Sequence, residues 1–206
     1  MSAVLKIVTV RPEPVTVESF APFGDVLAPR PTPPITNQTL IDKGFVRTKD
    51  PVRAERYPDF DALDYWTPVA EISRDPMRFG YLRPKERPMR VSWFERHVLG
   101  TQTFIPIGGK RAVFVVAPRS DNADPDALPD LAKSRAFLLD GSVGVNIHPG
   151  TWHWTPFPIE PGADFIILVR DRAGPDDLNF VDLERRLGAR VDVDNGGASG
   201  ADRGAG

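Results

Sequence analysis

The residues of this chain best suited to chemistry are its histidines, because the sequence contains three of them and no cysteine. Imidazole titrates near neutral pH and is the commonest neutral metal ligand, so it can serve proton transfer or metal binding. The lack of cysteine excludes disulfides, thiolate nucleophiles and cysteine-ligated zinc. His97, His148 and His153 all lie in two short segments beside glycine and proline turns. We therefore expect the three histidines to share one site.

The first segment carries a carboxylate and an amide beside its histidine. Successive side chains of a strand point to opposite faces, so Glu95 and His97 are predicted to share one face and Arg96 the other. We expect Glu95 to orient His97 or to bind a metal, and Arg96 to form a structural ion pair. The nitrogen and oxygen donors of His97 and His153, with those of Glu95 and Gln102, suit nickel, iron, manganese or zinc.

The second segment resembles the second half of a cupin signature, in which a Pro-x-Gly-x-x-His turn follows a strand. Gly150 and His153 keep the Gly-x-x-His part, and His148 stands where the cupin proline would be. The first segment lacks the cupin His-x-His, so the sequence does not contain the standard site of three histidines and one glutamate. We interpret His148 either as a residue at the mouth of the site or as a structural replacement for that proline.

Short runs of β-forming residues, separated by turn residues, must position these side chains. Their spacing of about 8–12 residues is typical of an antiparallel sandwich or barrel. The 17 glycines and 22 prolines also suit many short strands better than a few long helices. The predicted strands cover residues 4–10, 79–82, 90–95, 102–105, 112–117, 135–139, 144–148 and 165–170.

Two helices and a tail complete the predicted organisation. Residues 126–133 and 176–187 are predicted to be helical, the second as an amphipathic helix. From residue 188 onward the chain has few apolar residues and many glycines, which predicts disorder over residues 188–206. We expect residues 1–187 to form a single domain. The proline-rich residues 29–60 predict a long irregular segment of the kind that is often functional.

Composition excludes several classes of function. The 26 Lys and Arg against 28 Asp and Glu give a net charge of −2, without the basic surplus that nucleic-acid binding requires. No apolar run approaches the roughly 20 residues of a membrane helix, and the first residues lack the apolar core of a signal peptide. The sequence therefore predicts a cytoplasmic protein with a small-molecule substrate, and without nucleic-acid or membrane partners. No nucleotide or organic cofactor is expected.

Two longer motifs resemble the signatures of the ureidoglycolate lyase family. Residues 95–106, ERHVLGTQTFIP, resemble ERHPxGxQxFIP. Residues 135–153 carry RAF and then GVNIHPGTWH, which resemble the family's RAF…GVNYHxxxWH. The similarity extends over about residues 19–183. It implies a mainly β fold, a cupin-like antiparallel β-barrel or jelly roll with a few short helices. It also implies a homodimeric lyase that splits ureidoglycolate into glyoxylate and urea during allantoin and purine breakdown.

That reaction needs a base for the hydroxyl proton, an acid for the departing nitrogen and a cation for the carboxylate. The resemblance assigns His97 and His153, supported by Glu95 and Gln102, to the catalytic group, with the acid and the base left undecided. A divalent metal, nickel or another transition metal, would be held by His97 and His153 and would replace the base.

The remaining predicted site residues would bind the substrate. Gln102 and Asn146 can hydrogen-bond the ureido group. Arg83 can clamp the carboxylate with its planar guanidinium or be a plain surface charge. His148 is predicted to line the site. Trp152 and Trp93 can form an apolar wall around the substrate or belong to the core.

Departures from the family pattern leave the exact substrate open, and among them is a longer segment between Asn37 and Arg56. Ile147 stands where the family often has tyrosine, and Trp154 stands where a second histidine is common. Two other functions therefore stay as alternatives. One is a metal-dependent cupin dioxygenase or isomerase that acts on a small organic acid. The other is a non-catalytic cupin module that binds a small acid.

Overall fold

Short strands form most of the chain, as the spacing of its turns predicts. The computed structural model describes residues 4–29, 75–171 and 176–196. Its strands are β1 Lys6–Val10, β2 Pro12–Pro14, β3 Gly24–Leu27, β4 Met77–Leu82, β5 Arg90–Val91, β6 Trp93–His97, β7 Gln102–Ile107, β8 Ala112–Ala117, β9 Arg135–Leu139, β10 Gly144–Ile147, β11 Trp152–His153, β12 Phe157–Pro158, β13 Asp164–Arg170, β14 Leu178–Asp182 and β15 Ala189–Val193. The predicted strands therefore recur with small changes at their ends, and the fold is mainly β.

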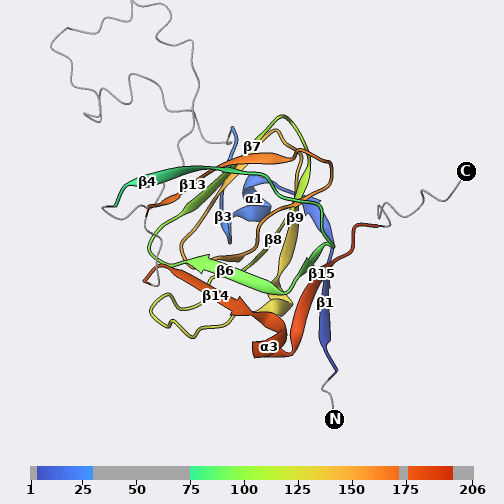
Figure 1. Cartoon of the computed structure of the whole chain (residues 1–206), viewed down its shortest axis with the longest axis vertical. Coiled ribbons are helices and arrows are strands. Elements are labelled where there is room, and N and C mark those ends of the chain that lie inside the picture. The colour runs from blue at the N-terminus through green and yellow to red at the C-terminus, as the bar shows by residue number, and fades with distance from the viewer. Residues whose placement is uncertain (1–3, 30–74, 172–175, 197–206) are drawn as a thin grey trace, which may run out of the picture. The chain divides into compact units, whose positions relative to one another are not determined.

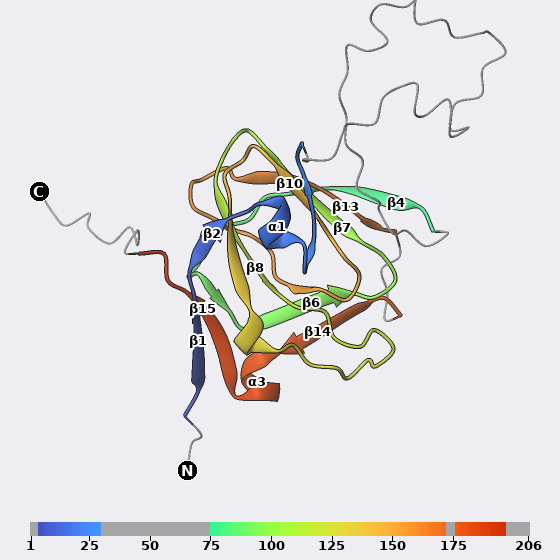
Figure 2. The ribbon, with the colours of Figure 1, turned by 180° about the vertical axis from the view of Figure 1, so that it is seen from behind.

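The strands form three sheets. A five-stranded sheet has the order β3-β10-β7-β13-β4, and a seven-stranded sheet has the order β14-β6-β11-β8-β9-β2 with β12 beside β8. In both views of the molecule the strands form a ring, with β7 and β13 on the side opposite β6 and β14 (Figures 1 and 2). A smaller sheet has the order β1-β15-β5. β1 with β15 and β2 with β9 are parallel pairs. Antiparallel pairs join β7 with β10, β13 with β7 and β4, β6 with β11 and β14, β8 with β9, β11 and β12, and β15 with β5.

Aromatic side chains fill the interior between the two larger sheets. The rings of Phe104 on β7 and Phe114 on β8 lie 5.1 Å apart, and that of Phe165 on β13 lies 6.4 Å from Phe104. Phe20 and Phe137 make an edge-to-face contact at 5.1 Å. All five rings are at most 2% exposed, so each contributes roughly 1.5–3 kcal/mol of burial. This interior is the apolar surrounding of the candidate site.

The other face of the seven-stranded sheet carries a second core. Phe94, Val115 and Trp152 alternate with the residues that face the interior, and they pack in one cluster with Leu183 and Val191. Because Val191 belongs to β15, this cluster joins the small sheet to the back of the seven-stranded sheet. The two cores leave Glu95 and His97 of β6 and His153 of β11 on the interior face.

The helices are short and have defined caps. The helix α1, Val17–Phe20, begins with a capping box in which Thr16 and Ser19 exchange hydrogen bonds. The helix α3, Leu183–Leu187, begins after Asp182, and Gly188 ends it at a φ of 59°. None of the described helices is long and apolar enough to span a membrane.

Two sequence predictions about helices are wrong. Residues 178–182 of the predicted second helix form β14, which pairs with β6 over five positions, and the helix begins only at Leu183. Apolar packing against β6 therefore prevails over helical periodicity there. In residues 126–133 only Leu131–Lys133 form a 3-10 turn. Pro129 removes a backbone donor in the middle of that predicted helix.

The predicted disorder of residues 188–206 is wrong for its first part. Ala189–Val193 form β15, in which Val191 is fully buried, between β1 and β5. The short alternation of Ala189, Val191 and Val193 supplied enough apolar surface to pair a strand. Residues 1–26 and 70–206 belong to one compact unit. Except for Pro29, the predicted irregular segment 29–60 lies outside the described residues.

Candidate active site

Two histidines and a glutamate meet on the interior face of the seven-stranded sheet. Glu95 and His97 share a face of β6, as their spacing predicts, and His153 on β11 pairs directly with Glu95. One ligand atom from each of the three lies within 4.8 Å of the others. His97 is 7% exposed and His153 is 1% exposed. The structure therefore confirms that Glu95 and His97 share a face, and His153, which the sequence analysis assigns to the same site, lies beside them.

A tight turn brings the second histidine segment against the first. Gly150 adopts a φ of 84°, which residues with a side chain rarely adopt. Its N–H donates to the carbonyl of His97 at 2.6 Å. The turn is therefore anchored directly to the end of β6, and three residues later it delivers His153 to the cluster. The glycine of the cupin-like motif has a clear local function.

The two ring nitrogens of His153 face different partners. Nδ1 lies 2.9 Å from the carbonyl oxygen of Thr151, which can only accept, so we assign a proton to Nδ1. Nε2 lies 2.7 Å from Oε1 of Gln102 and 3.3 Å from Oε1 of Glu95. Oxygen atoms thus surround Nε2, and this arrangement suits a cation at that position, either a proton or a metal.

Gln102 shows that the cluster draws on both large sheets. It begins β7 of the five-stranded sheet, and its side chain is 7% exposed. Its hydrogen bond to His153 crosses the interior to the seven-stranded sheet. Gln102 and His153, which the sequence analysis assigns to one site, are therefore in direct contact.

The glutamate of the cluster is held in its charged form. Burial raises the pKa of Glu95, but the hydrogen bond and charge of His153, together with the charge of His97, outweigh it and leave that pKa below the usual value. A carboxylate that stays charged between two imidazoles favours a proton or a metal ion beside it. This charge is the main electrostatic feature of the site.

A second carboxylate, Asp177, contacts the other histidine. Its Oδ2 lies 3.1 Å from Nδ1 of His97, and its Oδ1 accepts the N–H of Leu99 at 2.8 Å. Burial raises the pKa of Asp177, and the hydrogen bonds from His97 and Leu99 lower it to a net value below the usual one. Sequence analysis missed Asp177 because it lies in the stretch predicted as an amphipathic helix and no motif marks it.

Two predicted substrate-binding residues lie away from the cluster. Asn146 pairs with Thr103 and accepts its hydroxyl hydrogen bond at 2.8 Å. The next residue, Ile147, pairs with Gln102, so Asn146 faces the opposite side of the sheet from Gln102. His148 contacts Asp25, with Nε2 3.2 Å from Oδ2. The three histidines therefore do not share one cluster, because the His148 side chain faces Asp25.

Arg83 is engaged elsewhere in the five-stranded sheet. Its guanidinium donates two hydrogen bonds to Asp164, at 2.6 and 2.9 Å, and Tyr81 donates to the same carboxylate. Asp164 pairs with Ile107, five positions along β7 from Gln102, which corresponds to roughly 16 Å. The structure does not bring Arg83 to the histidine cluster.

Trp152 and Arg96 belong to the second core. The indole of Trp152 is 1% exposed, donates to Ser120 at 2.8 Å and packs under the guanidinium of Arg96 at 4.6 Å. Arg96 is fully buried and donates to Asn179, to Ser120 and to the backbone carbonyls of Asp121 and Asp124. Trp152 is therefore core and not a wall of the site. Arg96 is therefore structural, as predicted, but among the described residues it donates to amide, hydroxyl and carbonyl oxygens and not to the carboxylate of an ion pair. Trp93 is 44% exposed on the Glu95 face of β6.

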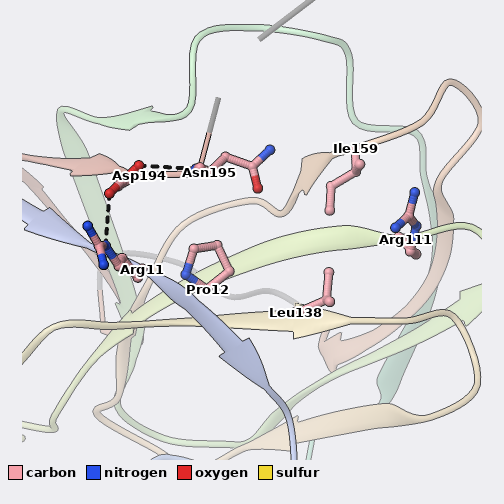
Figure 3. A pocket seen from close by; sticks show the side chains of 8 residues that line it. Arg11, Pro12, Arg111, Leu138, Ile159, Asp194 and Asn195 are labelled. Atoms are coloured by element: carbon pink, nitrogen blue, oxygen red, sulfur yellow. Dashed lines mark hydrogen bonds and ion pairs between the residues drawn. The ribbon is translucent and has the colours of Figure 1, made fainter. Parts of the chain in front are cut away.

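A separate cleft of about 530 Å³ lies between the end of β1 and the chain that follows β15. Pro12, Leu138 and Ile159 line it, and Arg11 donates to Asp194 at 2.8 Å at its edge (Figure 3). None of the predicted site residues lines this cleft, so it has no part in the candidate active site.

Comparison with known proteins places the chain in a family. The model of the family described as ureidoglycolate lyase matches residues 7–189. A protein of Pseudomonas paraeruginosa named ureidoglycolate lyase is 33% identical over 168 residues, covering 81% of this chain and 86% of its own. Proteins of the same name from Pseudomonas fluorescens and Escherichia coli are each 32% identical, covering 85% and 81% of this chain and 93% and 89% of their own. These matches include both histidine segments and the strands that carry them, and the chain belongs to the ureidoglycolate lyase family.

Proposed function

We propose that this protein is a lyase that splits ureidoglycolate into glyoxylate and urea. The observation that carries the proposal is the cluster of Glu95 with the buried His97 and His153 in a chain of this family. In the reaction the hydroxyl of ureidoglycolate loses its proton, its C–O bond becomes the carbonyl of glyoxylate, and the bond from carbon to ureido nitrogen breaks. That nitrogen takes up a proton and leaves as urea, so atoms and charge balance.

His97 is the better candidate for the base. Its Nδ1 faces Asp177, so the unshared electron pair of the neutral ring is expected on Nε2. A nitrogen with an unshared pair can accept the hydroxyl proton of the substrate. Imidazole suits this step because its ordinary pKa lies close to the working pH.

His153 is the better candidate for the acid. Its Nε2 faces the oxygens of Glu95 and Gln102, which support a proton at that atom. The charge of Glu95 stabilises the protonated ring before transfer, and the low exposure of the site strengthens that interaction. The proton moves from Nε2 to the departing nitrogen, while the amide of Gln102 can turn to the ureido group.

The same three residues fit a divalent metal such as nickel. Two imidazoles and a carboxylate form a donor set that transition metals accept, and their ligand atoms are close enough to share one ion. When bound, a metal at Glu95, His97 and His153 would lower the pKa of the substrate hydroxyl and stabilise the resulting alkoxide. Elemental analysis of the wild type and of Glu95→Gln tests this site without an activity assay. A metal present in the first and lost in the second supports it, and equal metal content in both contradicts it.

Product analysis tests the proposed reaction. The protein is incubated with racemic ureidoglycolate, and glyoxylate, urea, ammonia and dissolved oxygen are followed together. We expect one urea for each glyoxylate, with no ammonia and no oxygen consumption. Oxygen consumption would favour the dioxygenase alternative, and binding of ureidoglycolate without turnover would favour a binding module. Either outcome would overturn the lyase assignment. The homodimer and the cytoplasmic location stay predictions.

A further inference from the structure

Asp177 stands in an unusual position beside the base. It is fully buried, at the start of the chain that enters β14, and Leu178 of that strand pairs with His97. Both carboxylate oxygens are used: one faces Nδ1 of His97 and the other accepts the backbone N–H of Leu99. The guanidinium of Arg170 lies 3.9 Å from the oxygen that faces His97. Because these groups surround the buried carboxylate of Asp177, it is held in one orientation as a hydrogen-bond acceptor.

We propose that Asp177 is a positioning residue that fixes the tautomer of His97. In this tautomer the proton is on Nδ1, and the unshared pair is on Nε2, the atom that accepts the hydroxyl proton of the substrate. The catalytic use of this tautomer rests on the proposed function, whereas the tautomer itself follows from the contact between Asp177 and His97. A charged carboxylate only accepts hydrogen bonds, so the neutral imidazole beside it must donate from Nδ1. The same arrangement of carboxylate and histidine orients bases and metal ligands in other enzymes.

Asp177 also has a structural role, which the test must separate from the tautomer. Its backbone carbonyl accepts the N–H of Val98 at 3.0 Å and its side chain accepts that of Leu99, so it secures the turn after β6. Removal of the whole side chain would disturb both roles at once. A variant is needed that keeps the turn and changes only the atom facing His97.

Asp177→Asn has this property. The N–H of Leu99 can only donate, so the amide oxygen of the new side chain must stay on Leu99. The amide NH₂ then faces Nδ1 of His97 and can be accommodated only if that nitrogen becomes the acceptor. The proton of the neutral ring moves to Nε2, and the atom that should accept the substrate proton is blocked. The opposite orientation of the amide is disfavoured, because it would place the side-chain NH₂ against the backbone N–H of Leu99, and both groups are donors.

Nitrogen-15 NMR reads the tautomer directly. Protonated and bare imidazole nitrogens have well separated shifts, and only three histidines contribute signals. The spectrum of His97→Asn identifies the signals of His97 by their loss. At about pH 8.5, where ordinary imidazoles are neutral, we expect His97 protonated on Nδ1 in the wild type and on Nε2 in Asp177→Asn. A wild-type His97 that is protonated on Nε2, or on both nitrogens, would overturn the proposal, and this measurement needs no variant of Asp177.

Kinetics supply the second measurement. We expect Asp177→Asn to lower kcat by about 10- to 100-fold, the usual effect of losing such a partner, with KM little changed and the thermal transition retained. Asp176→Asn is the matched control, because Asp176 is exposed and contacts Arg170 at 3.4 Å, whereas the carboxylate that faces His97 is that of Asp177. Equal kcat values for Asp177→Asn and Asp176→Asn would contradict the proposal. A wild type that does not cleave ureidoglycolate would overturn the proposed function and leave the NMR result standing.

Discussion

The imidazole rings of His97 and His153 lie 25° from parallel, with their centroids 6.1 Å apart. They come from neighbouring antiparallel strands, and the pairing of His153 with Glu95 sets both rings on the same face of the seven-stranded sheet. Each ring has its own carboxylate, Asp177 for His97 and Glu95 for His153. Two similar side chains in adjoining positions are thus given different partners, which is how one can accept a proton while the other donates one.

Arg83→Ala tests where the substrate carboxylate binds. The geometry places Arg83 on Asp164, away from the cluster, so we expect KM for ureidoglycolate to stay close to the wild-type value. Steady-state kinetics of glyoxylate release measure it. If Arg83 clamped the substrate carboxylate, its replacement by alanine would instead raise KM more than it lowers kcat. That pattern would return Arg83 to the site, in agreement with the sequence prediction.

Asp164→Asn tests the ion pair itself through the pH dependence of stability. The hydrogen bonds from Arg83 and Tyr81 lower the pKa of Asp164 from 3.8 to about 2. A carboxylate with a lowered pKa in the folded state stabilises the fold above its unfolded pKa and loses this contribution as pH falls through the folded value. The variant should therefore have a lower Tm at neutral pH, and its difference from the wild type should narrow between about pH 4 and pH 2. A difference independent of pH would contradict the assignment.

Strand parity explains how far the sequence predicted the site. Period-two alternation correctly placed Glu95 and His97 together and Arg96 opposite them. The same rule separates the neighbours Trp152 and His153, but to separate Asn146 from Gln102 it needs the register between strands, which no local pattern contains. Asn146 and Gln102 face apart only because Ile147, and not Asn146, pairs with Gln102. The side on which Asn146 lies therefore could not be predicted from the sequence, because it depends on pairing between strands.

The fold was predictable where apolar runs are long and was missed where they are short. The run from Ala112 to Ala117 became β8 without change. Leu178–Asp182 and Ala189–Val193 are strands because they pair with β6 and β1, over distances that no local propensity encodes. Asp177 was missed for the same reason, since its importance comes from a partner 80 positions earlier in the chain.

Val191→Ala tests whether the chain after Gly188 belongs to the fold. Val191 is fully buried, between β1 and β5, so the smaller side chain leaves a cavity. We expect a loss of about 1–3 kcal/mol in the free energy of unfolding, measured by urea denaturation. Arg190→Ala is the comparison, because Arg190 is partly exposed on the same strand. Wild-type stability of Val191→Ala would show that β15 contributes little.

The rate of glyoxylate release from ureidoglycolate, compared among single histidine variants, tests the central claim most directly. We expect His97→Asn and His153→Asn each to lower kcat at least about a hundredfold, the low end for a general acid or base. His148→Asn should stay close to the wild-type rate, because His148 faces Asp25 and not the cluster. Near-wild-type rates in both His97→Asn and His153→Asn would contradict the account.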